Sequence, residues 1–91
     1  MSFGGPGGDN FIFHPGVGVD TTVNFNPQHD TIEFENFTNF QTVQQLQSLM
    51  TNDAHGDAVI NLGNHDSITL ANVQVSDLHA SSFIFQHAIL A

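Results

Sequence analysis

The stretch that decides the fold lies near the start of the chain and reads Gly4-Gly5-Pro6-Gly7-Gly8-Asp9-Asn10-Phe11-Ile12. Glycine tolerates positive φ and close backbone approach, so this run suits a tight turn whose carbonyl groups point inward. Asp9 closes the turn, and Phe11 and Phe13 then recur two positions apart, as in a half-buried strand. The stretch therefore predicts a glycine-rich turn that leads directly into a β-strand.

The same unit of turn and strand recurs along the chain. An aspartate ends each turn, at Asp9, Asp20, Asp30, Asp57 and Asp66, with intervals of 11 and 10 residues in the first three copies and 9 in the last two. Apolar residues stand two and four positions after three of these aspartates, at Phe11 and Phe13, Ile32 and Phe34, and Ile68 and Leu70. After Asp20 the apolar residues come one place later, so we expect a bulge or a looser strand there.

Composition narrows the possible ligands. The 91 residues include nine carboxylates, no lysine, no arginine and no cysteine. A domain this small usually gains stability from a disulfide, a metal ion or a partner. A disulfide is excluded here because the chain has no cysteine. The missing cations argue against nucleic acid and against an anionic membrane surface. The natural counter-charge is Ca²⁺, because it prefers carboxylate and carbonyl oxygens.

Stacked turns would need such an ion. Neighbouring strands lie about 4.8 Å apart, so equivalent aspartates in stacked turns become neighbours. Two charges about 5 Å apart repel by roughly 3 kcal/mol at an effective dielectric constant of 20. A Ca²⁺ ion between the turns would replace this repulsion with coordination and would link binding to folding. The alternative is that each Gly-Asp cluster is only a hairpin turn.

The second half of the chain has a different pattern. Apolar residues recur at helical spacing, at Phe40, Val43, Leu46 and Met50. They predict a helix over residues 40–51, capped by Thr38 or Asn39, that covers the open end or side of the strands. Residues 58–62 and 67–70 then read as a hairpin or as two further coils, and the repeat register favours coils. A last strand is expected at residues 82–85.

From Gly4 to about Phe85 the chain resembles the C-terminal region of RTX, or hemolysin-type calcium-binding, proteins, which bacteria export by type I secretion. Residues 4–12 match the RTX nonapeptide G-G-x-G-x-D-x-U-x at each fixed position, if the apolar position U admits Phe. Weaker matches occur at Pro15-Gly16-Val17-Gly18-Val19-Asp20-Thr21, Asp30-Thr31-Ile32, Gly56-Asp57-Ala58-Val59-Ile60, Asp66-Ser67-Ile68-Thr69-Leu70 and Ser82-Phe83-Ile84-Phe85.

This resemblance implies an all-β fold, a right-handed parallel β-roll or β-helix with the short helix at about residues 40–51 packed as a cap. It implies one module over residues 1–91, with repeat coils in 1–36, helix and linker in 37–55, and terminal strands with a secretion-signal segment in 56–91. The module would fold on Ca²⁺ outside the cell, secreted or at the cell surface, and its C-terminal segment would bind the type I secretion transporter.

The resemblance also implies calcium ligands. Gly5, Gly7 and Asp9 would share one ion with Gly16, Gly18 and Asp20. A second ion between Asp20 and Asp30 and a weaker site at Asp66 are further candidates. The implied set of metal-binding residues is therefore Gly5, Gly7, Asp9, Gly16, Gly18, Asp20, Asp30 and Asp66.

The same residues bear on other possible functions. The chain has no cysteine nucleophile, no lysine and no Gly-x-Ser-x-Gly turn, so we expect no catalysis. Glu33 and Glu35 share a strand face, which is more typical of a solvated surface than of an acid–base pair. The six histidines lack a H-E-x-x-H spacing, although His29, His55 and His65 stand near acidic turns, so a histidine-based transition-metal site stays an alternative. An open sheet end would permit a homodimer or an adhesion module.

Overall fold

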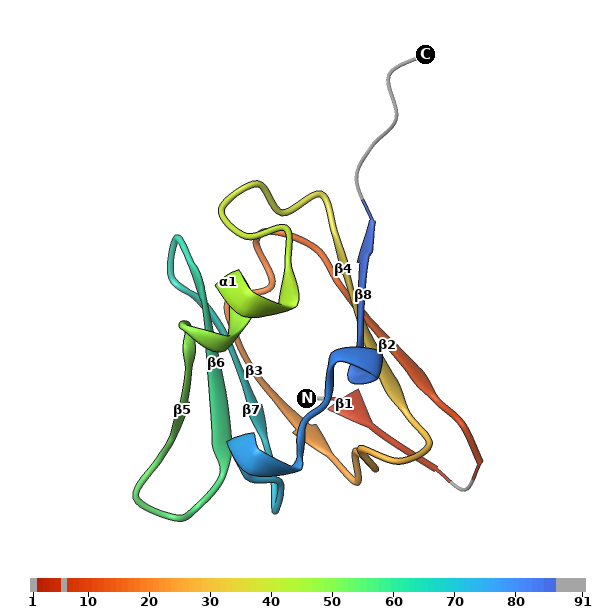
Figure 1. The fold of residues 1–91 in the computed structure, drawn as a ribbon. Helices are drawn as coiled ribbons and strands as arrows, with labels where there is room; N and C mark the ends of the chain where they lie inside the picture. The colour runs from red at the N-terminus through yellow and green to blue at the C-terminus, as the bar shows by residue number, and fades with distance from the viewer. Residues whose placement is uncertain (1, 6, 87–91) are drawn as a thin grey trace.

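The computed structural model describes residues 2–5 and 7–86 and places two β-sheets face to face (Figure 1). The first part of the chain forms β1 (Ser2–Phe3), β2 (Asn10–Phe13), β3 (Val19–Val23) and β4 (Thr31–Glu35). The short helix α1 (Val43–Gln47) is followed by β5 (Met50–Asn52), β6 (Ala58–Gly63) and β7 (Asp66–Leu70). Two 3₁₀ turns, η1 (Val75–Asp77) and η2 (Ala80–Ser82), precede β8 (Phe83–Gln86).

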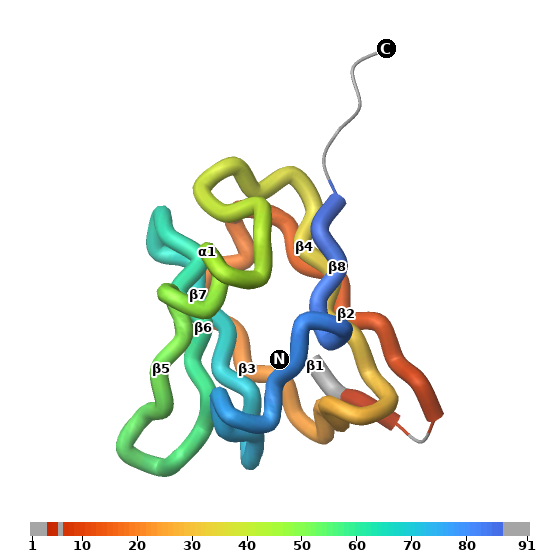
Figure 2. Tube along the Cα trace, viewed as in Figure 1, coloured from red at the N-terminus to blue at the C-terminus, as the bar shows by residue number. Residues whose placement is uncertain are grey.

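Strands that follow one another at the start of the chain alternate between the two sheets. One sheet has five strands in the order β1-β3-β7-β6-β5, and the other has three in the order β2-β4-β8. The pairings of β3 with β1 and β7 are parallel, as are those of β4 with β2 and β8. The pairings β5–β6 and β6–β7 are antiparallel. Figure 2 follows the trace from one sheet to the other and back.

The predicted parallel β-roll is wrong. The structure is a small mixed fold of one parallel and one mixed sheet, and it is neither closed nor a solenoid. The hairpin between β6 and β7 explains the difference. Asn64 and His65 have φ angles of 53° and 67°, and positive φ at both central residues is what a two-residue type I′ turn requires. The chain therefore doubles back over residues 58–70, where two further parallel coils were expected.

The helix is also shorter than the predicted range of residues 40–51. It begins after Thr42, whose Oγ1 accepts a hydrogen bond from Gln45 N at 3.1 Å, so the cap is neither Thr38 nor Asn39. Beyond the helix the backbone extends again, and Met50–Asn52 pairs with β6 as an edge strand. Leu46 still faces the core and is fully buried. In Figure 1 the helix lies at the upper ends of the sheets, between them.

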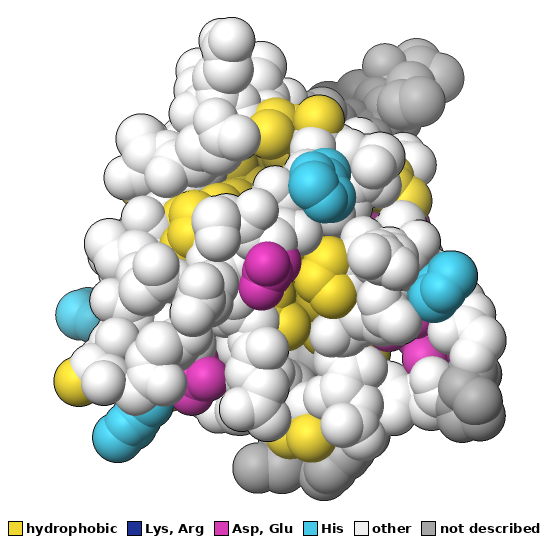
Figure 3. Space-filling view, turned by 60° about the horizontal axis from the view of Figure 1, so that its bottom comes forward, with side chains coloured by type: hydrophobic (Ala, Val, Ile, Leu, Met, Phe, Trp, Pro, Cys, Tyr) yellow, Lys and Arg dark blue, Asp and Glu magenta, His cyan; other side chains and the backbone are white. Residues whose placement is uncertain are grey.

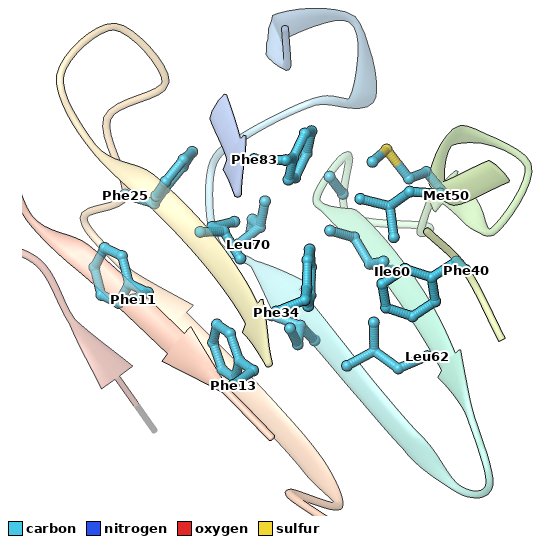
Figure 4. Packing of buried hydrophobic residues seen from close by; sticks show 14 of the residues in the cluster. Phe11, Phe13, Phe25, Phe34, Phe40, Met50, Ile60, Leu62, Leu70 and Phe83 are labelled. Atoms are coloured by element: carbon cyan, nitrogen blue, oxygen red, sulfur yellow. The ribbon is translucent and has the colours of Figure 1, made fainter. Parts of the chain in front are cut away.

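The apolar positions predicted to face the core are buried. Phe11, Phe13, Ile32, Phe34, Ile68 and Leu70 all belong to the hydrophobic cluster between the sheets. Figure 4 shows side chains from both sheets and from the α1 region pointing toward one another. Phe34 lies at the centre of the aromatic contacts, with ring centroids 5.1 to 6.4 Å from those of Phe13, Phe37, Phe40, Phe83 and Phe85. The core thus joins residues from the whole length of the chain.

The bulge expected after Asp20 is absent. Residues Val19–Thr22 pair one by one with Ser67–Leu70 of β7, so the strand keeps its register. The core position on β3 is therefore filled by Thr22, which is fully buried and whose Oγ1 has no hydrogen-bond partner among the described residues. Phe25 reaches the core because Asn24, with a φ of 64°, turns the chain after the strand.

Replacing Thr22 with valine should stabilise the protein. Valine has nearly the same shape, and it removes a hydroxyl group that lost its water contacts without gaining a partner. We expect the free energy of unfolding to rise by about 1 kcal/mol, measured by urea unfolding. The control is Thr21→Val on the opposite face of the same strand, which should change stability by less than about 0.5 kcal/mol. A less stable Thr22→Val variant would show that the hydroxyl is satisfied.

Candidate functional site

The residues predicted to bind calcium, except Asp20, fall into two groups in space. The first comprises the Asp9 turn (residues 4–9, of which Pro6 lies outside the described residues) and the Asp30 turn (residues 26–30). These turns precede β2 and β4, which pair in parallel with Asn10 opposite Thr31. Asp9 N donates a hydrogen bond to Asp30 Oδ1 at 2.8 Å, and Thr31 N donates to Asp9 O at 2.9 Å. The two acidic turns are therefore stacked neighbours.

Each carboxylate of this group also closes its own turn. Asp9 Oδ2 accepts a hydrogen bond from Gly5 N, and Asp30 Oδ2 accepts one from Asn26 N, both at 2.8 Å. The turns approach each other at Gly8, where an added Cβ would lie 3.0 Å from the carbonyl oxygen of His29. Gly7 has a φ of 94°, which L residues rarely adopt. The glycine pattern thus serves a sharp turn and a close contact between turns.

The second group joins residues far apart in sequence. Asp66, at the start of β7, accepts hydrogen bonds from Gly16 N through Oδ2 and from Gly18 N through Oδ1, both at 2.8 Å. Both glycines have positive φ, 96° and 73°. The hydrogen bonds from Gly16 and then Gly18 lower the pKa of Asp66, against the opposing effect of burial. One carboxylate therefore fixes the glycine loop (residues 16–18) to the hairpin.

Asp20 lies apart from Asp9 in the pairing of the strands. β2 and β3 belong to different sheets, so the turns of these two residues are not neighbours in a ladder. Asp20 Oδ1 accepts a hydrogen bond from Thr21 N at 2.9 Å, and its partner in register is Ile68. The structure thus pairs Asp9 with Asp30, 21 residues away, where the sequence had suggested Asp20. Successive strands alternate between the two sheets, so neighbours within one sheet are two repeats apart in sequence, and the interval between stacked aspartates is about twice the repeat length.

The donor set suits a hard cation. In residues 2–5 and 7–86 no three histidine or carboxylate side chains are placed so that they could hold a metal ion. The two acidic turns instead offer carboxylate and carbonyl oxygens, which Ca²⁺ accepts as ligands in mixed sets. A carboxylate has about four lone-pair sites, so the N–H bonds described above leave acceptor capacity. The residues present therefore fit Ca²⁺ better than a soft metal ion.

Other carboxylates, which the sequence did not single out for this role, also bind the main chain. Asp53 Oδ1 accepts hydrogen bonds from Asp57 N and His55 N, each at 2.9 Å, and the bond from Asp57 N makes the largest contribution to lowering the pKa of Asp53. Asp57 Oδ1 accepts from Asn72 N at 2.8 Å, and Asp77 Oδ2 from Gln74 N at 3.0 Å. These carboxylates thus hold turns in a chain that has no lysine or arginine.

Glu33 and Glu35 lie on β4, on the face opposite the buried residues Ile32 and Phe34. A hydrogen bond between the two carboxyl groups lowers the pKa of Glu33 and raises that of Glu35. Glu33 Oε1 also accepts from Asn10 Nδ2 at 3.0 Å, and Glu35 Oε1 lies 3.4 Å from His14 Nε2. The predicted sharing of a strand face is confirmed.

No protein-family model and no curated protein matches this sequence. Among the residues that the structure describes, no helix is long and apolar enough to cross a membrane.

Proposed function

We propose that this chain is a non-catalytic calcium-binding module of an exported protein. The observation that carries the proposal is the stacking of the Asp9 turn on the Asp30 turn, with Asp9 N only 2.8 Å from Asp30 Oδ1. Two aspartates that follow glycine-rich or polar turns are thereby held in adjacent turns, with the carboxylate of Asp30 on the backbone of Asp9. No lysine or arginine exists in the chain to offset them.

The electrostatics favour a divalent ion at this place. The N–H groups that bond the carboxylates supply only partial positive charge, and the chain carries a formal net charge of −9. A bound Ca²⁺ ion would cancel two negative charges at once. Because it would bind the folded turns and not the unfolded chain, it would stabilise the fold in proportion to the logarithm of its concentration above the dissociation constant.

The proposed ligands are Asp9 and Asp30, with backbone carbonyl oxygens of their two turns. A second, weaker site is proposed at the glycine loop and Asp66, where a carboxylate and two left-handed glycines lie together. This assignment keeps most of the residues implied by the RTX resemblance. It changes which of them act together.

The resemblance to RTX proteins supports export and the extracellular location. We propose that residues 56–91 carry the signal that a type I secretion transporter reads, and that the chain folds when it meets calcium outside the cell. Extracellular calcium modules bind with dissociation constants of about 10⁻⁴–10⁻³ M, which suits such a change of environment. The last part of this signal, residues 87–91, lies outside the described residues.

A calcium titration tests the proposal. In chelator, then with increasing Ca²⁺, the wild-type chain should gain β structure by circular dichroism and become more resistant to thermal unfolding. Replacing both Asp9 and Asp30 with asparagine should raise the calcium midpoint by at least about tenfold, because removal of a charged ligand costs about 1.4 kcal/mol or more. Asparagine keeps one side-chain oxygen for the turn hydrogen bonds.

The matched control is Asp53→Asn. Asp53 also accepts backbone hydrogen bonds but lies outside the stacked turns, so its replacement should raise the calcium midpoint by much less than tenfold. The proposal is wrong if the wild-type chain shows the same spectrum and stability in chelator as in millimolar calcium. Equal calcium midpoints in wild type and the Asp9/Asp30 variant would show that the ion binds to another part of the chain.

A further inference from the structure

A cavity opens at the end of the molecule that carries η1, beside the Asp30 turn and at the end opposite the glycine loop. It has a volume of about 580 Å³ and lies between residues 24–28, which follow β3, and residues 71–79, which follow β7. Figure 3 brings this end of the molecule forward and shows hydrophobic side chains in a hollow, beside an acidic side chain. Cavities of this size hold small molecules in other proteins.

The lining combines an apolar floor with a polar rim of mainly amide groups, together with one carboxylate and one imidazole. Phe25 and Val73, each 4% exposed, are the buried residues of the lining. The amide side chains of Asn24, Gln28 and Asn72 lie around them and are exposed to solvent. Within the part of the chain that the structure describes, these three amide groups make no hydrogen bond to protein. They are therefore available to a bound molecule.

The walls of the cavity are held by hydrogen bonds that do not involve these amides. On one wall, Asp30 Oδ2 accepts from Asn26 N, and Asn26 Oδ1 accepts from Gln28 N at 2.9 Å. On the other wall, Asp57 fixes Asn72 N and Asp77 fixes Gln74 N. A ligand would thus meet walls whose backbone is already held in place, which lowers the entropy cost of binding.

The chemistry of the rim selects among ligand classes. An anion is disfavoured, because the chain has no lysine or arginine and a strongly negative net charge. A simple ammonium group needs only acceptors and would leave the amide NH₂ donors unpaired. A hydroxyl group both donates and accepts hydrogen bonds, so it can pair with the NH₂ group and with the carbonyl oxygen of an amide side chain. The C–H groups of a sugar ring would in turn cover the apolar floor.

We propose that this cavity binds a neutral saccharide, with Asn24, Gln28 and Asn72 bonding its hydroxyl groups. The cavity shares residues 26–28 with the Asp30 turn, but neither Asp9 nor Asp30 lines it, and this inference goes beyond the calcium-binding function. The saccharide is either a free sugar or part of a polysaccharide, and the same chemistry recognises both.

The experiment follows backbone amide signals of the ¹⁵N-labelled full chain, in millimolar calcium, during titration with methyl glycosides of glucose, galactose and mannose. A glucose tetrasaccharide is the probe for a polysaccharide, and spermidine is the cationic comparison. We expect at least one saccharide to produce saturable shifts on both walls, residues 24–28 and 71–79. Tighter binding of the tetrasaccharide than of the monosaccharides would identify a polysaccharide as the source.

The variants are Asn24→Gly and Asn72→Gly. Both asparagines have positive φ, 64° and 62°, so glycine removes the amide without straining the backbone. Each should weaken saccharide binding by about fivefold, the loss expected for one hydrogen-bonding side chain. Asn64→Gly is the matched control, because Asn64 also has positive φ, 53°, but lies in the hairpin turn outside the cavity.

Three outcomes would overturn the inference. The first is that no saccharide shifts the signals of either wall. The second is that spermidine shifts them and the saccharides do not, which would make the cavity a cation site. The third is that both cavity variants bind saccharide as the wild type does.

Discussion

Replacing Phe34 with alanine is expected to lower the free energy of unfolding by about 3–5 kcal/mol, the usual cost of removing a buried aromatic ring. Phe34 is 1% exposed, and its ring contacts those of five other phenylalanines from the start, middle and end of the chain. A small domain has only about 5–15 kcal/mol of stability in total. The variant should therefore be partly or wholly unfolded at physiological temperature.

Urea unfolding followed by circular dichroism measures this effect. Phe34→Leu refills part of the cavity and should recover some of the loss. Ile12→Ala is the surface control, because Ile12 is 49% exposed and its truncation should cost less than about 0.5 kcal/mol. Equal losses for Phe34→Ala and Ile12→Ala would mean that the packing between the sheets is not where the stability resides.

Acid should release the glycine loop from the hairpin. The folded protein lowers the pKa of Asp66 from its ordinary value of 3.8, because Gly16 N and Gly18 N bond the charged form. A lowered folded-state pKa contributes stability that is present above pH 3.8 and is lost as the pH falls through the folded-state value. Asp66→Asn should therefore be less stable than wild type at pH 7, and the difference should shrink below pH 3.8.

Thermal unfolding of both proteins across this pH range, repeated at two saturating calcium concentrations, separates the effect from calcium binding, because a difference caused by the hydrogen bonds does not change with calcium. Asp53→Asn is the control, since Asp53 has a lowered pKa but closes only a loop between near neighbours in sequence. It should reduce stability less than Asp66→Asn does, because a short loop loses little entropy on closure. If the stability difference between Asp66→Asn and wild type stayed constant down to the lowest pH, the charge of Asp66 would not be the source of that difference.

Sequence periodicity identified the buried faces but not all the strand partners. The apolar residues two and four positions after Asp9, Asp30 and Asp66 are in the core, because a strand side chain can point only to one face or the other. The same pattern is compatible with a parallel coil and with a hairpin. The usual mark of a type I′ turn is Asn-Gly, and here Asn64 is followed by a left-handed histidine, so the hairpin lacked its strongest signal.

For the helix and the candidate site, too, only some features could be predicted from the sequence. Leu46 and Met50 are both buried, but one lies in a helix and the other in an edge strand, so a helical spacing of apolar residues overstated the helix. The acidic turns could be recognised from glycine and aspartate in the sequence. The bond from the glycine loop to Asp66 could not, since it links residues 48 and 50 positions apart and leaves no local trace.

The arrangement of the sheets has a consequence for any attempt to divide the protein. β3 lies between β1 and β7, and β4 lies between β2 and β8. A fragment that stopped after residue 36 would expose one full edge of each of these two strands and would free the glycine loop from Asp66. The segments that follow one another along the chain are thus not separable building blocks, and fusion or shuffling experiments should carry residues 2–86 as a single piece.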